Sequence, residues 1–497
     1  MPHATTFVSL LRCPFCVGAL TQSSALELKP NGEIAYGILA CTGCGFEYPV
    51  VAGIAILMAA HETIDSKFET TEVTLLDGPR VGELLSQLKA GDSASALASL
   101  LNPSKLGGNW FPQLEIDAVR NAELGAAASF EGDGSGSGGP RLGRLVRRAK
   151  RIAKKRLGKL VLPRARARLA EFLSKHEQDL SALDAIDLYY RRYSGAETYN
   201  YFAYRFGQPR HLAALSLALP LLDTSGPLLD LACGAGHITH FLRAARPNRT
   251  VIGLDRDFFR LWLAAHYTEP GAHYVCAPAD RRLPFDDGAF GGIFCSDAFH
   301  YFLQRAAAVL ELRRATAEDG VLVLARFGNV NVKPREGYEL TPAGYERLLA
   351  DLPHVFLGED ELVATYRART TPDLSRRPIS SELEQQKWLS LVASRNPAVF
   401  SAPKPLDHWP HAHGRLQINP IYREDARAPN GDVTLRFQFP SHWYQLENEG
   451  YRAYAPETCT VPGSVLRALA ERAPHPELDS LVSRFVVIGM PERYASS

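Results

Sequence analysis

The feature that most constrains the fold is a series of apolar runs that alternate with helix-like stretches in the middle of the chain. The runs occupy 227–232, 249–254, 272–276, 290–295 and 320–325. Each run has the length of a buried strand, and the stretches between them are long enough to hold helices. This alternation predicts an α/β fold in which a doubly wound, mostly parallel sheet is covered by helices on both faces.

A glycine-rich loop follows the first of these runs. The sequence LLDLACGAGH, 228–237, puts Asp230 inside the strand and Cys233, Gly234 and Gly236 directly after it. Glycines at a strand-to-helix turn let a ligand approach the backbone closely. A dinucleotide site has the pattern G-x-G-x-x-G, but Thr239 stands where the third glycine would be. The loop therefore does not match the dinucleotide pattern.

Two further acidic residues stand at the ends of the second and third apolar runs. Asp255 ends the second run and Asp280 follows the third. A carboxylate at the first place can accept both hydroxyls of a ribose, and one at the second can accept the exocyclic amine of an adenine. Asp230 would repel a pyrophosphate and suits a cationic amino-acid group instead. The acids favour a ligand that joins an adenosine to such a group.

Four segments resemble the motifs of class I S-adenosylmethionine (SAM)-dependent methyltransferases. They are LLDLACGAGH, VIGLDRD, ADRRLPFDDGAFGGIFCSDAFHYF and LRRATAEDGVLVLARF, within about 190–350. The resemblance implies a seven-stranded methyltransferase sheet that binds SAM. Asp255 would bind the ribose, and Asp280 and Arg281 would flank the adenine. The other cofactor-binding residues it implies are Asp230, Cys233, Gly234, Gly236, Arg256 and Ser296.

The acceptor side of such a site would follow the fourth run. Asp297, His300 and Tyr301 stand there, and we predict that they are catalytic, with His300 as the general base. Two alternatives to this role are that His300 merely packs on the sheet edge, and that the enzyme uses no base and acts by positioning the acceptor alone. The segment CSDAFHYF lacks the N-P-P-Y-like run of many enzymes that methylate amino groups, so we expect an oxygen or carbon acceptor in a small or lipid-linked molecule.

An upstream tyrosine cluster precedes this sheet. Tyr199, Tyr201 and Tyr204 would either cover the cofactor or form the aromatic face of a core helix.

Two CxxC pairs near the N-terminus predict a metal site. Cys13 and Cys16 are separated from Cys41 and Cys44 by 24 residues, and four thiolates at this spacing are typical of structural Zn²⁺. With the following FEYPVVAGIAIL, the segment resembles the small zinc-ribbon protein that activates methyltransferases of translation components. The resemblance implies a scaffold or activator role, with a strand added to the catalytic sheet.

A strongly basic segment separates the two regions. GDGSGSGG, 132–139, predicts a flexible linker. The next 28 residues, 141–168, hold 13 Lys or Arg and no acid, with apolar residues at helical spacing. Such a basic amphipathic helix either packs on an acidic domain of the same chain or binds an anionic surface, which would be RNA or membrane headgroups.

The C-terminal region is the least defined by its sequence. SRFVVIGMPERY, 483–494, is expected to be the antiparallel strand that closes the methyltransferase sheet, which would make 366–482 a cap. The expected segments are 1–60 (zinc ribbon), 61–130 (helical), 131–140 (flexible linker), 141–175 (basic amphipathic helix), 176–365 (methyltransferase core), 366–482 (cap or insertion) and 483–497 (closing strand and tail).

No apolar run reaches the roughly 20 residues of a membrane-spanning helix, and no signal peptide is evident, so we expect a cytoplasmic protein. The function predicted is that of a SAM-dependent methyltransferase with structural zinc. Two alternatives are a methyltransferase of RNA or of a translation protein, and a non-catalytic scaffold with a vestigial SAM fold.

Overall fold

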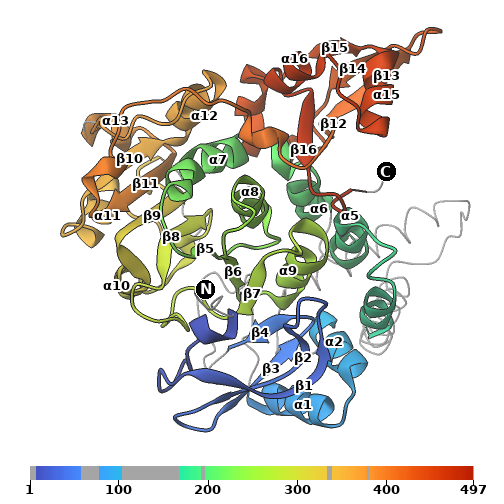
Figure 1. Ribbon diagram of the computed structural model, residues 1–497. Coiled ribbons are helices and arrows are strands. Elements are labelled where there is room, and N and C mark those ends of the chain that lie inside the picture. Colours follow the sequence, from blue (N-terminus) through green and yellow to red (C-terminus); the bar gives the residue numbers. More distant parts are fainter. Residues whose placement is uncertain are drawn as a thin grey trace, which may run out of the picture.

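The computed structural model describes residues 7–57, 78–102, 167–191, 196–332, 338–377 and 380–495 (Figure 1). A mixed sheet runs through the molecule in the order β1-β2-β3-β4-β7-β6-β5-β8-β9-β11-β10. The expected linker 131–140 and most of the basic segment, 141–166, lie outside the described residues. Residues 167–175, at the end of the basic segment, are helical.

The five apolar runs form the parallel centre of the sheet, as predicted. Neighbouring strands pair in parallel in the order β7-β6-β5-β8-β9. Their bounds are β5 Leu228–Leu231, β6 Val251–Asp255, β7 His273–Cys276, β8 Phe290–Ser296 and β9 Thr316–Gly328.

Helices cover this centre. They include α7 Pro209–Leu222, α8 His237–Ala245, α9 Phe258–Leu263 with its continuation η6 Ala264–Thr268, α10 Arg305–Ala315, α11 Pro342–Leu348, α12 Glu359–Arg367 and α13 Ser380–Glu384. Helix α5, Ala182–Ile186, with η4 Asp187–Arg191, and then α6, Ala196–Ala203, with η5 Arg205–Gly207, precede the sheet.

The strand that closes the methyltransferase sheet is not the predicted one. Strand β11, Trp388–Ser394, lies antiparallel between β9 and β10, His354–Gly358. The segment 483–494 contains β16, Val487–Met490, which pairs with β12, Arg415–Ile418, in a separate two-stranded sheet. Every residue of β11 is buried, as expected for an interior strand. Both segments are short and apolar, so composition alone could not tell which of them pairs with β9.

The remaining C-terminal elements form a separate layer beside α7 and α6 (Figure 1). They are β13 Tyr422–Arg427, β14 Val433–Phe437, α14 His442–Asn448, η10 Glu449–Ala453, β15 Thr458–Val461, α15 Gly463–Glu471 and α16 Leu478–Ser483. Strands β13, β14 and β15 make a third, antiparallel sheet.

The N-terminal ribbon is continuous with the catalytic sheet. Strands β1 Leu20–Leu28, β2 Ile34–Cys41, β3 Glu47–Val51 and β4 Ile54–Ile56 pair antiparallel in order. Strand β4 then pairs in parallel with β7, so the added strand that the ribbon's resemblance implied is confirmed. Ile54 and Ile56 enter one apolar core and Ala55 enters the other, so β4 is covered on both faces. Helices α1, Gly78–Lys89, and α2, Ser93–Leu101, pack beside the ribbon.

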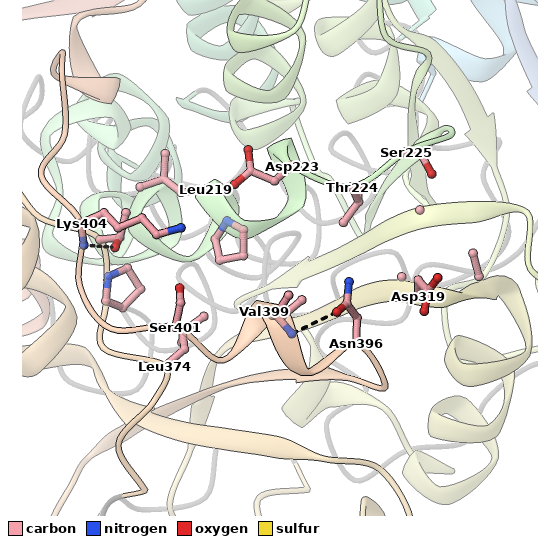
Figure 2. Close-up of a pocket in the computed structure, with 17 residues that line it drawn as sticks. Leu219, Asp223, Thr224, Ser225, Asp319, Leu374, Asn396, Val399, Ser401 and Lys404 are labelled. Atoms are coloured by element: carbon pink, nitrogen blue, oxygen red, sulfur yellow. Dashed lines mark hydrogen bonds between the residues drawn. The ribbon is translucent and has the colours of Figure 1, made fainter.

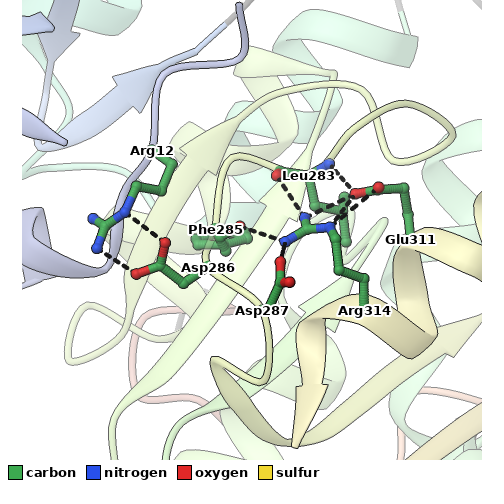
Figure 3. A network of polar contacts seen from close by, with 7 residues as sticks. All are labelled: Arg12, Leu283, Phe285, Asp286, Asp287, Glu311 and Arg314. Atoms are coloured by element: carbon green, nitrogen blue, oxygen red, sulfur yellow. Dashed lines mark hydrogen bonds and ion pairs between the residues drawn. The ribbon is translucent and has the colours of Figure 1, made fainter. Parts of the chain in front are cut away.

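A polar network also joins the ribbon to the loop that follows β7 (Figure 3). Arg12 forms an ion pair with Asp286, with Nε donating to Oδ1 at 2.6 Å, and its amide donates to the carbonyl of Pro284 at 2.8 Å. From the other side, the Arg314 guanidinium donates to the carbonyls of Leu283 and Phe285 at 3.1 and 2.9 Å. The loop is thus fixed by the ribbon and by α10 together.

Candidate functional site

A cavity of about 190 Å³ lies at the carboxyl edge of the parallel strands, where the predicted site residues meet. Its wall contains seven of the nine predicted cofactor residues and two of the three predicted catalytic residues: Asp230, Cys233, Gly234, Asp255, Arg256, Asp280, Ser296, Asp297 and Tyr301. Gly236, Arg281 and His300 are not part of the wall. The sequence motifs therefore converge on one place in the fold.

The backbone of the glycine loop adopts a conformation that requires glycine. Gly234 and Gly236 have φ angles of 54° and 78°, in the left-handed region that favours glycine. Gly236 is also crowded, because a Cβ there would lie 2.9 Å from the Cβ of Ala264. Gly236 therefore shapes the turn into α8 and does not face the cavity.

Asp255 closes this loop against β6. One of its carboxylate oxygens, Oδ2, accepts a hydrogen bond from the amide of Gly234 at 2.9 Å, and Oδ1 accepts one from the amide of Asp257 at 2.9 Å. The second bond leaves Oδ1 beside the N-terminus of α9. The carboxylate thus fixes the loop while its outer face lines the cavity.

Asp230 is almost completely buried beneath the loop. Thr239 Oγ1 donates a hydrogen bond to its Oδ2 at 2.6 Å. Burial raises the pKa of Asp230 to about 7, although the Thr239 bond opposes this shift. A cationic group placed nearby would restore the ionised form.

Asp297 is held by a cluster of arginines. Nη1 of Arg326 donates to Oδ1 at 2.5 Å, and Nη1 of Arg210 donates to Oδ2 at 3.1 Å. Arg205 lies 3.9 Å away. Burial acts to raise the Asp297 pKa, but these arginines outweigh it and hold the pKa well below its usual range. Asp297 therefore stays a fixed anion and is poorly suited to take up a proton.

His300 is fully buried behind the cavity. Its ring centroid lies 4.1 Å from that of Tyr301 and 5.9 Å from that of Trp388. This placement matches the alternative of a histidine packed at the sheet edge, and the role of general base stays a prediction. Tyr301 does line the cavity and is 43% exposed, so it stands at the mouth.

Eleven of the twenty residues in the wall were not predicted to bind the cofactor or to catalyse the reaction. Among them are Tyr201 and Phe202 on α6, Arg205 on η5 and His237 at the start of α8. Tyr201 is one of the three tyrosines considered as a possible cover, whereas Tyr204 packs in the C-terminal core. Arg205 is 5% exposed, and its Nε has no hydrogen-bond partner among the described residues. In the sequence, the one sign that Arg205 could have a function was its position as a basic residue inside the aromatic run 199–206.

A second cavity, of about 490 Å³, lies at the opposite, amino edge of the sheet (Figure 2). Asp223, Asp319, Asn396 and Lys404 supply polar groups to its wall. Its wall contains none of the predicted cofactor-binding or catalytic residues and no part of the glycine loop. Ligands of open α/β sheets bind at the carboxyl ends of the strands, so we assign the cofactor to the smaller cavity.

The four predicted metal ligands are brought together. The Sγ atoms of Cys13, Cys16, Cys41 and Cys44 all lie within 4.8 Å of one another, with 3.3 Å between Cys16 and Cys41 and 3.7 Å between Cys13 and Cys44. Tetrahedral zinc with four thiolates requires an Sγ–Sγ spacing of about 3.8 Å. The amide of Gly43 donates to Cys41 Sγ at 3.3 Å, as thiolate ligands prefer. The donor set fits a closed structural zinc site.

The loop 407–415, DHWPHAHGR, holds three histidines, and one of them has a structural role. His411 is buried, with Nδ1 2.9 Å from the Tyr366 hydroxyl and Nε2 3.0 Å from the carbonyl of Val482. His408 and His413 lie close together, with ring centroids 5.4 Å apart. Among the residues that the structure describes, the four cysteines form the one cluster suited to a metal.

Comparison with known proteins agrees with this geometry. Residues 229–324 match the family described as "Methyltransferase domain". The chain is 32% identical over 124 residues to a demethylmenaquinone methyltransferase of Thermus thermophilus, covering 24% of this chain and 56% of that protein. It is 28% identical over 102 residues to a malonyl-[acyl-carrier protein] O-methyltransferase of Legionella pneumophila, covering 20% and 36%. The chain thus spans about half or less of the length of these curated relatives.

Among solved structures, a complex between the Trm112 methyltransferase activator of Haloferax volcanii and a methyltransferase matches with 18% identity and a TM-score of 0.28, covering 43% of this chain and 97% of that one. The low score adds nothing to the assignment. The motifs, the cavity and the family match identify a class I SAM-dependent methyltransferase domain. It is joined to an N-terminal four-cysteine cluster consistent with a zinc ribbon.

None of the helices within the described ranges is both long and apolar enough to cross a bilayer.

Removing zinc is expected to destabilise the methyltransferase core as well as the ribbon, because β4 continues the catalytic sheet. A strong chelator should lower the unfolding midpoint of the whole chain in one cooperative transition, followed by tryptophan fluorescence. Elemental analysis should find about one zinc per chain in the untreated protein and none in Cys41→Ser. A core transition that does not move on chelation would contradict this prediction.

SAM binding is expected to strengthen as the pH rises from 6 to 8. Because the pKa of Asp230 in the empty protein is about 7, above its ordinary value, its protonated form contributes stability at low pH that is lost as the pH rises through 7. A cationic cofactor favours the carboxylate, so binding at pH 6 should release a proton. Calorimetry in two buffers with different ionisation enthalpies measures that release.

The control for this experiment is Asp230→Asn, which keeps the shape of the side chain. Its SAM affinity should be weaker and should vary less between pH 6 and 8. Equal proton release by the wild type and the variant would show that another group is responsible.

Proposed function

We propose that the protein transfers the methyl group of SAM to an oxygen or carbon atom of a small-molecule or lipid-linked acceptor. The observation that carries this proposal is the cavity at the carboxyl edge, where Asp230, Asp255 and Asp280 meet beside the glycine loop. The names of the two curated relatives support the acceptor class, since one acts on demethylmenaquinone and the other is an O-methyltransferase of malonyl-[acyl-carrier protein].

The wall offers a partner for each polar part of SAM. Asp255 would accept the ribose hydroxyls and Asp280 the adenine amine. The ammonium group would lie near Asp230 and the carbonyl of Ser296, and the carboxylate near Arg205. Arg205 suits that task because it is buried and lines the cavity. Its nearest carboxylate, that of Asp297, is 3.9 Å away and already forms closer ion pairs with Arg210 and Arg326. When bound, SAM supplies an electrophilic methyl group on a cationic sulfur.

The chain's own residues would orient the acceptor and exclude water. Tyr201 and Phe202 cover one side of the cavity, and Tyr301 stands at its mouth. Asp297 is an anion at every physiological pH because its arginines hold its pKa low. Its charge is compensated by those arginines, so Asp297 would act by holding Arg210 and Arg326 in place beside the cavity. Methyl transfer would then depend on alignment of the acceptor in line with the methyl group.

The alternatives have less support. The RNA or translation-protein acceptor depends on the ribbon's resemblance and on 141–168, of which 141–166 lie outside the described residues. The vestigial-scaffold alternative is disfavoured by the complete set of acids around an open cavity.

Replacing Asp255 by Asn is expected to weaken SAM binding about 10- to 100-fold. The amide has one acceptor oxygen where the carboxylate has two, so either the Gly234 or the Asp257 amide loses its partner, and a charged hydrogen bond to the ribose, worth about 1.5–3 kcal/mol, is lost. Calorimetric titration with SAM and S-adenosylhomocysteine measures the loss. The matched control is Asp319→Asn at the amino-edge cavity, which should bind like the wild type. No binding by a folded, zinc-loaded wild type would instead support the scaffold alternative.

The acceptor class is tested with SAM carrying a radioactive methyl group. We expect label to pass to an extractable small molecule, tried first with a reduced demethylmenaquinone analogue, or to an acyl thioester, tried with malonyl-acyl-carrier protein. Bulk tRNA and ribosomal protein are the competing acceptors in the same assay. Label found mainly in RNA or in a ribosomal protein would reject the small-molecule proposal.

A further inference from the structure

Tyr494, close to the C-terminal end of the described residues, contacts two walls of the cofactor cavity at once. Its hydroxyl donates a hydrogen bond to the carbonyl of Phe202 at 3.0 Å and lies 2.7 Å from Nε2 of His237. Both of those residues line the cavity, Phe202 from α6 and His237 from the start of α8. No motif of the methyltransferase domain includes Tyr494, which lies well beyond the matched range 229–324.

The segment that carries Tyr494 is firmly placed. It follows β16 and turns so that the amide of Tyr494 donates to the carbonyl of Pro491 at 3.1 Å. The carbonyls of Arg493 and Tyr494 accept the amides of Ala182 and Leu183, both at 2.9 Å, at the N-terminus of α5. The Arg493 guanidinium also donates to three main-chain carbonyls. The hydroxyl position is therefore set by the fold around it.

The hydrogen bonds determine which nitrogen of His237 carries a hydrogen. A tyrosine hydroxyl has one hydrogen, and the Phe202 carbonyl can only accept it. The hydroxyl oxygen must therefore accept from His237, so Nε2 of that ring is the N–H. Burial, with the positive charge of Arg205 as a second cause, lowers the pKa of His237 well below its ordinary value, which keeps the ring neutral. A neutral ring with a hydrogen on Nε2 has its lone pair on Nδ1.

We propose that Tyr494 is a positioning residue of the methyl-transfer cavity, which ties α6 to the glycine loop and holds His237 as an uncharged hydrogen-bond acceptor in the cavity wall. This inference rests on the proposed function. Through it, the C-terminal region, which the methyltransferase motifs do not reach, completes the active site. His237 then offers an acceptor nitrogen in the wall, whereas the predicted base His300 is buried outside it.

The test compares Tyr494→Phe with the wild type and with Tyr422→Phe. Tyr422 is a matched control, because it is also buried and its hydroxyl donates to one carbonyl, that of Pro456 at 2.9 Å, within the C-terminal layer. SAM affinity is measured by calorimetry at 15 °C. Loss of the hydroxyl should weaken binding about three- to tenfold, the range that a lost hydrogen bond predicts. Tyr422→Phe should bind SAM like the wild type.

A second readout reports on His237 directly. In protein labelled with ¹⁵N-histidine, the ring nitrogens of His237, assigned by comparison with His237→Gln, should show the Nε2–H tautomer in the wild type and in Tyr422→Phe. Tyr494→Phe should show a mixture of tautomers. A structural role alone would lower the unfolding midpoint without changing the tautomer.

Each outcome decides between the two proposals. If the wild type binds SAM and Tyr494→Phe binds it equally well, the inference is wrong and the proposed function stands. If the wild type does not bind SAM, the proposed function fails and the inference fails with it. If Tyr494→Phe does not fold, the wild-type spectrum still decides, because a hydrogen on Nδ1 or a charged ring at pH 7 would overturn the inference.

Discussion

The position of β5 between β6 and β8 determines where chemistry can occur in this molecule. From β5 the chain crosses to β6 on one side, and it later returns to β8 on the other. Connections that leave a strand in opposite directions open a crevice at its carboxyl end. Asp230, Asp255 and Ser296 belong to these three strands, and they line the same cavity although they are distant in sequence. The order of the strands therefore fixes the position of the site, and the side chains determine only what the site can bind.

The ribbon acts on this crevice through the sheet and through one loop. Pairing of β4 with β7 places the ribbon beside the strand that leads to Asp280. The Arg12–Asp286 ion pair then holds the loop after Asp280 from the ribbon side (Figure 3). A half-exposed ion pair contributes little stability by itself. The ion pair instead fixes the position of the loop, which Arg314 already holds from the opposite side.

Local sequence patterns predicted the parts of the site that local chemistry builds. The five strands, the glycine loop with Gly234 and Gly236, and the four cysteines all follow from spacing within short segments. The closing strand was missed because pairing is a long-range choice, and β11 and β16 are both short apolar segments. Arg205 was missed for a related reason. Its partner acid, Asp297, is far along the chain, so only the folded structure shows that the guanidinium faces the cavity.

The C-terminal layer supports one wall of the cavity from behind. It holds the segment from α6 to α7 from outside: Ser441 donates to Glu197, Arg423 to the hydroxyl of Tyr204, and Tyr454 to the carbonyl of Gly207. That segment supplies Tyr201, Phe202 and Arg205 to the cavity wall.

A wall made from short helices has little rigidity of its own, since α6 spans eight residues and η5 three. Its geometry must therefore come from what packs behind it. The geometry of this wall is then set by residues more than 200 positions away, as the Tyr204–Arg423 and Gly207–Tyr454 bonds show. The C-terminal layer and the catalytic sheet consequently shape the cavity together, and a methyltransferase core that ended after β11 would lack the support for the part of the cavity wall that α6 and η5 supply.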